Sequence, residues 1–207
     1  MDYKAELLNV VPTMNGWCDP TKANHIFDTV FERNPKVCVE LGVFAGRSLI
    51  AFALALAKRG TKGSVVYGVD AWAPGPATQN NDATNASWWR NLNYKGIKQE
   101  CEAVCQKLNL GKYVRLCQAT TVEAYALVEG GIDVLHIDAN HSPWDSCRDV
   151  TMWVDRVVDG GIVYLGDEDW STMSYAKELL LRKCNKLTEI KTSNVCGVYQ
   201  KRFGKKN

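Results

Sequence analysis

Short apolar runs rich in β-branched residues alternate along the chain with longer segments of helical periodicity. This alternation is typical of βαβ units, in which helices cover both faces of a parallel sheet. The apolar runs predict strands at Val37–Leu41, Val65–Val69, Val114–Cys117, Ile132–Ile137 and Ile162–Leu165, the last one opened by a turn at Gly160-Gly161. The periodic segments predict helices at Pro20–Arg33, Arg47–Arg59, Ile97–Leu108, Val122–Val128, Trp144–Val157 and Met173–Cys184. The pattern therefore predicts an α/β fold with a doubly wound sheet.

Two stretches depart from this alternation. Leu187–Thr192 and Val195–Gln200 are separated by only two residues, a spacing that allows an antiparallel return but no parallel crossover. The sheet is therefore expected to be mostly parallel, with an antiparallel C-terminal strand. The segment Trp72–Asn93 is rich in Asn and contains two prolines, and it is expected to form an irregular, lid-like insertion.

Composition limits the domain count, the partners and the compartment. A chain of 207 residues with 46% hydrophobic residues fits a single domain, 1–207. Its 25 basic and 23 acidic residues are too balanced for the basic field that nucleic-acid binding requires, so we expect a small-molecule partner, and a homo-oligomer stays open. The chain lacks an apolar run of roughly 18 residues and a secretory leader, which predicts that it binds no membrane. The eight cysteines lack Cys-x-x-Cys spacing and favour structural thiols in a cytoplasmic protein, with disulfides or metal binding as the alternatives.

A glycine loop joins the first predicted strand to its helix. Gly42 and Gly46 are separated by three residues, at the point where a doubly wound fold binds its cofactor. The loop lacks both the Gly-x-Gly-x-x-Gly fingerprint and the Lys-Ser/Thr ending of a P-loop, so phosphate binding is disfavoured. Glu40, at the end of the strand, suits a cationic ligand instead. Asp70 ends the second strand, where a carboxylate can accept both hydroxyls of a ribose; the alternative is a turn-forming Asp.

Acidic residues follow the fourth and fifth predicted strands. Asp138 comes after the fourth strand and Asp167-Glu168-Asp169 after the fifth, and neighbouring parallel strands deliver their carboxyl ends to one rim. Converging carboxylates repel one another unless they are protonated or bridged by a cation, and oxygen ligands favour magnesium, calcium or manganese. His141 could take a hydroxyl proton near neutral pH. A structural role in the loop is the alternative for this histidine.

Several of these segments resemble known families. Glu40-Leu41-Gly42-x-x-x-Gly46-x-Ser48 resembles motif I of class I methyltransferases that use S-adenosylmethionine (SAM). His136-Ile137-Asp138-Ala139-Asn140-His141 and Asp167-Glu168-Asp169-Trp170 resemble methyltransferase family 24, which is related to the metal-dependent O-methyltransferases of the catechol and macrolide-sugar types. The resemblance extends over nearly the whole chain. Departures are Ala139, where the family more often has Gly, and Glu168, where a second Asp is common.

The resemblance implies a Rossmann-like methyltransferase sheet, SAM as cofactor, and transfer of its methyl group to a hydroxyl of a small polar acceptor such as a sugar or phenol. The implied cofactor-binding residues are Glu40, Gly42, Gly46, Ser48, Asp70, Ala71, Trp72, Thr120 and Asp138. The implied ligands of Mg²⁺ or another divalent cation are Asp138, Asp167 and Glu168, with Asp169 as an alternative. His141 is the implied catalytic base, at the position where the catechol type has Lys. The rival interpretations are metal-independent transfer to nitrogen or carbon, and a non-catalytic SAM-fold binding protein.

Other polar and aromatic residues have less specific interpretations. Thr121 is expected to cap the next helix, with Glu123 too close to complete a capping box. Trp17, Trp88 and Trp89 are expected to pack in the core or a loop, with one of the latter two covering a ligand as the alternative. Solvated surface charges are expected at Lys22, Arg47 and Arg148.

Overall fold

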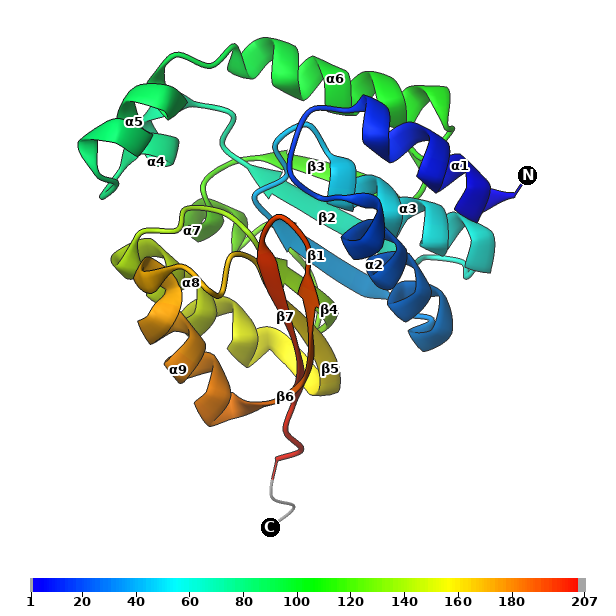
Figure 1. Ribbon diagram of the computed structural model, residues 1–207. Coiled ribbons are helices and arrows are strands. Elements are labelled where there is room, and N and C mark those ends of the chain that lie inside the picture. The colour runs from blue at the N-terminus through cyan, green and yellow to red at the C-terminus, as the bar shows by residue number, and fades with distance from the viewer. Residues whose placement is uncertain (1, 205–207) are drawn as a thin grey trace.

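The computed structural model describes residues 2–204, and a seven-stranded sheet of order β3-β2-β1-β4-β5-β7-β6 runs through its middle (Figure 1). The strands are β1 (Val37–Leu41), β2 (Val65–Asp70), β3 (Val114–Gln118), β4 (Ile132–Ile137), β5 (Val157–Leu165), β6 (Cys184–Lys191) and β7 (Val195–Lys201). The first five pair in parallel, whereas β7 pairs antiparallel with both β5 and β6. The predicted doubly wound sheet with an antiparallel C-terminal strand is confirmed.

Helices cover both faces of the sheet, each over its own apolar cluster (Figure 1). One face carries α1 (Tyr3–Val10), α2 (Pro20–Arg33), α3 (Arg47–Arg59) and α6 (Tyr94–Lys107). The other carries α7 (Thr121–Ala124), α8 (Pro143–Trp153) and α9 (Ser174–Lys183). Side chains alternate between the faces along each strand, so Cys38 of β1 packs under α2 and α3 while Val39 and Leu41 pack under α8.

The two helices that flank β1 have the predicted bounds because local signals fix their ends. Asp19 caps α2 by accepting the backbone N–H groups of Thr21 and Lys22, and Pro20 occupies the first helical position. Helix α3 begins after Gly46, with φ +96°, and ends at Gly60, with φ +69°.

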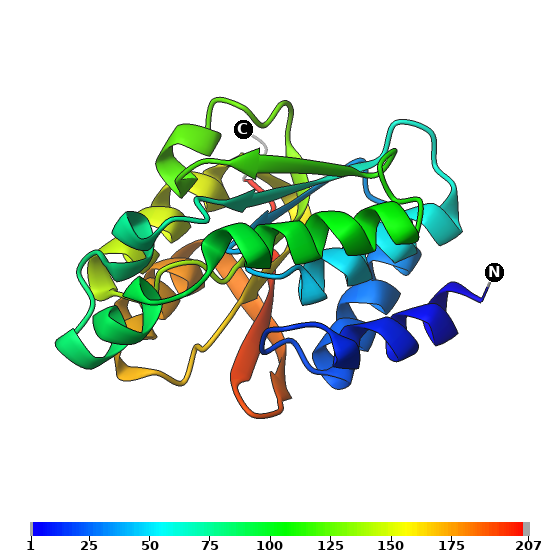
Figure 2. The same cartoon turned by 90° about the horizontal axis from the view of Figure 1, so that it is seen from above.

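The structure corrects two predictions of secondary structure and adds one helix that was not predicted. The segment Trp72–Asn93 is not irregular, because it contains α4 (Pro74–Thr78) and α5 (Ala83–Arg90), the latter capped by Asp82. Both short helices lie beyond the carboxyl ends of the strands (Figures 1 and 2). Gly160-Gly161 lies inside β5, where pairing with β4 shifts register, and is not a turn before it. Helix α1 had no prediction at all.

The cysteines and helices also bear on compartment and membrane binding. All eight cysteines lie in the described part of the chain and are free thiols. Among residues 2–204, no helix is both long enough and apolar enough to cross a bilayer.

Candidate functional site

A cavity of about 540 Å³ opens at the carboxyl ends of β1, β2 and β4, and Gly42, Asp70 and Asp138 all line it. The sheet order reverses between β1 and β4, and doubly wound folds bind their ligands at such a switch point. We call the part beside β1, β2 and β3 the glycine half (Gly42, Asp70, Ala71, Trp72 and Thr120). The part beside β4 and β5 is the acidic half (Lys22, Asp138, His141 and Asp167).

The two glycines of the loop have different surroundings. Gly42 lines the cavity with φ +88°, and a Cβ there would collide with the backbone carbonyl of Asp138. Gly46 does not line the cavity: it has φ +96°, and a Cβ would lie 2.7 Å from the Sγ of Cys101. Gly42 therefore lets β1 and β4 approach each other at the cavity floor, whereas Gly46 lets α6 pack against the loop.

Asp70 lies on the cavity wall where β2 ends. Its Oδ2 accepts the backbone N–H of Phe44 at 2.9 Å and its Oδ1 accepts that of Trp72 at 2.7 Å. Burial raises the pKa of this carboxyl, and the two backbone hydrogen bonds oppose that shift. Each oxygen keeps a lone pair for one more donor, as binding of a ribose would need. Ala71 and Trp72 line the cavity beside it.

Glu40 lies beneath the cavity and does not line it. Its side chain is fully buried, and its Oε1 lies 2.9 Å from Nδ1 of His136, its register partner on β4. Its other oxygen has no hydrogen-bond partner among the described residues. Direct contact with a cationic ligand, as expected from the sequence, therefore does not match this geometry. Ser48 is also buried but does line the cavity.

Thr120 caps α7, which corrects the sequence analysis. Its hydroxyl accepts the backbone N–H of Glu123, and the Glu123 carboxylate accepts the backbone N–H of Thr120, a complete capping box. Thr121 is instead the first helical residue, and its Oγ1 donates to Oδ1 of Asp149 at 2.6 Å. Both threonines line the cavity.

The acidic half brings three titratable side chains together. Nε2 of His141 lies 3.4 Å from Oδ1 of Asp138 and 3.3 Å from Oδ2 of Asp167. One ligand atom from each residue lies within 4.8 Å of the others. Burial alone would lower the pKa of His141, but the nearby carboxylate of Asp138 raises it above the ordinary value. Burial raises the pKa of Asp167, and the charge of Asp138 adds to that rise.

Glu168 does not join this cluster, so its predicted position beside the other carboxylates is wrong. Its carboxylate binds the Tyr199 hydroxyl and lies 2.5 Å from Nζ of Lys186. Asp167 has φ +50°, and this left-handed turn sends the next side chain toward β6 and β7. The alternative ligand, Asp169, is exposed and accepts the backbone N–H of Val195.

Lys22 belongs to the site, although the sequence predicts a solvated charge. It is buried, with 8% of its surface exposed, and its Nζ lies 2.8 Å from Oδ2 of Asp138. Burial would lower its pKa, but the charge of Asp138 raises the pKa well above the usual range. A signal was present in the sequence, because Lys22, Ile26 and Val30 recur at four-residue spacing on the buried face of α2.

Aromatic side chains form one wall of the cavity. Trp17 packs with its ring centroid 5.1 Å from that of Phe44, and the Trp88 and Trp89 rings meet edge to face at 4.8 Å. Trp17 and Trp88 remain about half exposed, so the tryptophans both pack on one another and line the cavity. The ring of Trp170 lies 5.4 Å from that of His141 at the acidic half.

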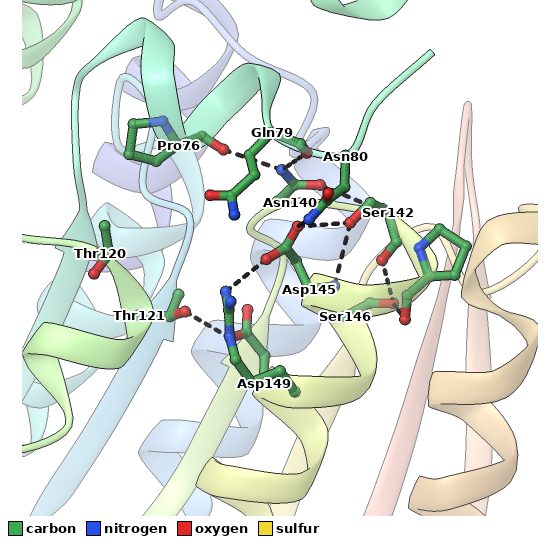
Figure 3. A network of polar contacts seen from close by, with 12 residues as sticks. Pro76, Gln79, Asn80, Thr120, Thr121, Asn140, Ser142, Asp145, Ser146 and Asp149 are labelled. Carbon is green, nitrogen blue, oxygen red and sulfur yellow. Dashed lines mark hydrogen bonds and ion pairs between the residues drawn. The ribbon is translucent and has the colours of Figure 1, made fainter.

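A polar network ties the α4–α5 segment to the loop that carries His141 (Figure 3). Nδ2 of Asn140 donates to the carbonyls of Pro76 and Gln79, at 3.0 and 2.8 Å. Asn80 donates to Asp145, which also accepts the Ser142 hydroxyl (Figure 3). The segment is thus fastened over the cavity by side chains of the β4–α8 loop and of α8.

The two arginines with predicted surface charges also face the cavity. Arg148 pairs with Asp145 at 2.7 Å, and its buried Nε lies 4.0 Å from Oδ1 of Asp149 with no hydrogen-bond partner among the described residues. Nε of Arg47 donates to the carbonyl of Met14 at 2.7 Å. Neither is a fully solvated charge.

A glycine loop after β1, an acid at the end of β2, a cavity at the switch point and the antiparallel strand β7 beside β5 fit the class I methyltransferase type of α/β protein. Residues 39–167 match the family model of methyltransferase family 24, described as a methyltransferase domain, and the chain belongs to this family. The search of curated proteins found no match.

Solved structures share the fold at low sequence identity. An O-methyltransferase from Bacillus cereus in complex with S-adenosylhomocysteine (SAH) is 12% identical, with a TM-score of 0.63 over 97% of this chain and 90% of that one. TomG, the O-methyltransferase of tomaymycin synthesis from Streptomyces achromogenes, was solved with SAM and is 9% identical, with a TM-score of 0.67 over 98% and 91%. The SAH-bound methyltransferase PaMTH1 from Podospora anserina is 12% identical, with a TM-score of 0.66 over 98% and 89%.

Proposed function

We propose that this methyltransferase uses SAM to methylate a hydroxyl oxygen of a small polar acceptor, with His141 as the general base. One observation carries the proposal: a single cavity of about 540 Å³ joins the glycine half, with Asp70, to the acidic half, with His141 between two carboxylates. Cavities of this size suit small molecules. The described O-methyltransferases, solved with SAM or SAH, support both the cofactor and the oxygen acceptor.

The glycine half fits SAM. Gly42 leaves room for close approach to the backbone, and Asp70 has lone pairs free for the ribose hydroxyls. Ser48, Ala71, Trp72 and Thr120 would contact the rest of the cofactor. Gly46 would act indirectly by letting α6 pack against the loop, and Glu40 by holding His136. When bound, SAM supplies a sulfonium methyl: the acceptor oxygen forms a new O–C bond, the S–C bond breaks, and its electron pair stays on sulfur.

The acidic half would orient the acceptor and take its proton. Nε2 of His141 accepts the hydroxyl proton, and the carboxylates of Asp138 and Asp167 stabilise the resulting imidazolium. Trp170 packs beside the imidazole and limits its movement. Holding the oxygen in line with the methyl group is the larger contribution expected from the protein.

A divalent cation also fits this cluster. Nε2 of His141 and Oδ1 of Asp167 are buried and lack hydrogen-bond partners among the described residues, and Asp138 lies beside them. Asp138, His141 and Asp167 would therefore hold the ion, with His141 in the place that the sequence assigns to Glu168. A bound cation would lower the pKa of an acceptor hydroxyl. Nε2 of His141 cannot both bind an ion and accept a proton. A site in which His141 is a metal ligand and a site in which it is the general base therefore exclude each other.

The state of the cysteines supports a cytoplasmic location. The eight free thiols suit a reducing compartment, and no described helix could span a bilayer. We infer a cytoplasmic enzyme with a diffusible acceptor.

The test is methyl transfer from labelled SAM to panels of sugars, phenols, amines and carbon acceptors, with and without chelator. We expect label on hydroxyl oxygens, loss of transfer in Asp138→Ala, and SAH binding by that variant close to the parent's, because Asp138 contributes its side chain to the acidic half. Transfer to amines or carbon alone would refute the proposal. Activity that is lost with chelator and restored by Mg²⁺ or Mn²⁺ would favour the metal-bound version.

A further inference from the structure

The two oxygens of Asp138 have different partners. Oδ2 lies 2.8 Å from Nζ of Lys22 and 3.3 Å from Nε2 of His136, whereas Oδ1 faces His141 at 3.4 Å. His136 is fully buried and is held from its other side by Glu40 at 2.9 Å. Two nitrogens thus lie close to Oδ2, whereas Oδ1 faces the His141 side chain of the cluster with Asp167.

Lys22 is held firmly in this position. It lies in the first turn of α2, which Asp19 caps, and its side chain runs along the buried face with Ala23 and Ile26. Its side chain is only 10% exposed, and Asp138 is its one acidic partner among the described residues. A buried ammonium that left this carboxylate would lose both its charge partner and its hydrogen bond.

The charges of the acidic half therefore differ from those of an open metal site. Lys22 already brings one positive charge to the Asp138 carboxylate, which a divalent ion at this cluster would also use. A second cation at that carboxylate would face repulsion from the ammonium in a poorly solvated place, where charge interactions are strong.

We propose that Lys22 is the resident cation of the acidic half: it neutralises and orients Asp138, and it competes with divalent ions for that carboxylate. The proposal rests on the proposed function for the role of the acidic half as acceptor site. It deepens that function by assigning the positive charge beside the acceptor to a side chain of α2. Lys22 is a positioning residue for Asp138, and His141 stays free to act as base.

The test measures Mn²⁺ binding by electron paramagnetic resonance and calorimetry, with SAH present and no acceptor. We expect Lys22→Met and Lys22→Gln to bind Mn²⁺ at least tenfold more tightly than the parent, because the competing charge is gone. Lys22→Arg keeps the charge and should bind like the parent. Lys4→Met is a matched control, because Lys4 pairs with Asp28 at 2.7 Å outside the cavity.

If the Lys22–Asp138 ion pair served only to hold the structure together, a different result is expected: loss of the pair would leave Mn²⁺ affinity unchanged or weaker. Equal or weaker binding in both Lys22→Met and Lys22→Gln would overturn the proposal. Adding Asp138→Asn to Lys22→Gln should remove the gain, and a gain that persists would also overturn it. If Lys22→Met no longer binds SAH, the polar Lys22→Gln decides the question. The readout needs no turnover, so failure of methyl transfer would count against the proposed function alone.

Discussion

The two halves of the cavity differ in what forms their surface: mainly backbone in the glycine half, and side chains in the acidic half. In the glycine half the backbone forms the surface: Gly42 has φ +88° with no room for a Cβ, and Asp70 is held by backbone N–H groups. In the acidic half side chains from three separate segments meet: Lys22 from α2, Asp138 and His141 from the end of β4, and Asp167 from the end of β5. The first half depends on local conformation, and the second depends on tertiary packing and charge.

This difference determines how each half should respond to substitution. A change of backbone shape in the glycine half should remove binding outright, since no side chain can move to compensate. A change in the acidic half should leave the shape intact and alter proton transfer or ion affinity.

The largest effect is expected for Gly42→Val. A side chain here would meet the Asp138 carbonyl and force a residue with φ +88° into a strained conformation, so we expect no measurable SAH binding and no turnover. Calorimetry with SAH measures the loss, and circular dichroism reports whether the variant is folded. Gly111→Ala is the control, because a Cβ at Gly111 meets nothing within 4 Å. A folded Gly42→Val protein with the parent's affinity would show that the glycine half is not the cofactor site.

The next effect is expected for His141→Ala. Loss of a general base should slow turnover by roughly 10²–10⁴-fold, while SAH binding stays within a few-fold of the parent because the glycine half is untouched. Single-turnover rates with labelled SAM measure the change. Leu187→Ala, a half-exposed position on β6, serves as a control for nonspecific loss. A His141→Ala enzyme as fast as the parent would remove this histidine from the mechanism.

Sequence could predict the glycine half because its residues are nearly contiguous. Strand β1, the loop to α3 and the acid at the end of β2 follow from apolar runs and glycine spacing, and the structure has them as expected. Glu40 marks the limit of this reasoning: a strand-end acid was expected to face a ligand, but the alternation of β1 turns it toward His136 beneath the cavity.

The acidic half was predicted only in part because contacts between distant segments decide it. The convergence of Asp138 and Asp167 follows from parallel topology, and the structure brings them together around His141. The departure of Glu168 depends on the positive φ of Asp167 and on partners from β6 and β7, which no local pattern reveals. Lys22 lies 116 residues from Asp138 in the sequence, so only its place on the apolar face of α2 hinted at burial.

A third prediction concerns Asp149, an acid that lines the cavity outside both halves. Burial raises the pKa of Asp149 from 3.8 to about 6, and the Thr121 hydroxyl opposes that rise. Because the pKa is higher in the folded state, the protonated group's stabilisation is fully present below about pH 3.8 and is lost as pH rises through about 6. The ionised carboxylate therefore destabilises the protein at pH 7, by up to about 3 kcal/mol.

Asp149→Asn should relieve this penalty. We expect it to raise the free energy of unfolding at pH 7 by up to about 3 kcal/mol and to leave it nearly unchanged at pH 4, measured by urea denaturation. Thr121→Val removes the opposing hydrogen bond at 2.6 Å and should shift stability in the other direction at pH 7. If the difference in free energy of unfolding between Asp149→Asn and the parent is the same at pH 4 and pH 7, the pKa of Asp149 is not raised by burial.

The smallest effect is expected where the α4–α5 segment is fastened over the two halves. Asn140→Ala removes the two hydrogen bonds that the amide donates to the carbonyls of Pro76 and Gln79, each contributing about 0.5–1.5 kcal/mol. It also removes the bond that Oδ1 accepts from the backbone N–H of Ser142, which lies within the β4–α8 loop. Amide exchange in residues 74–90 should accelerate by roughly 5–150-fold, and SAH should slow it in the parent if the segment closes on bound cofactor. Asn91→Ala is the matched control, because among residues 2–204 its side-chain amide donates only to the carbonyl of Ser87 in α5. Exchange that is equal in Asn140→Ala and the parent, and unaffected by SAH, would mean that the segment is a fixed wall of the cavity and not a lid.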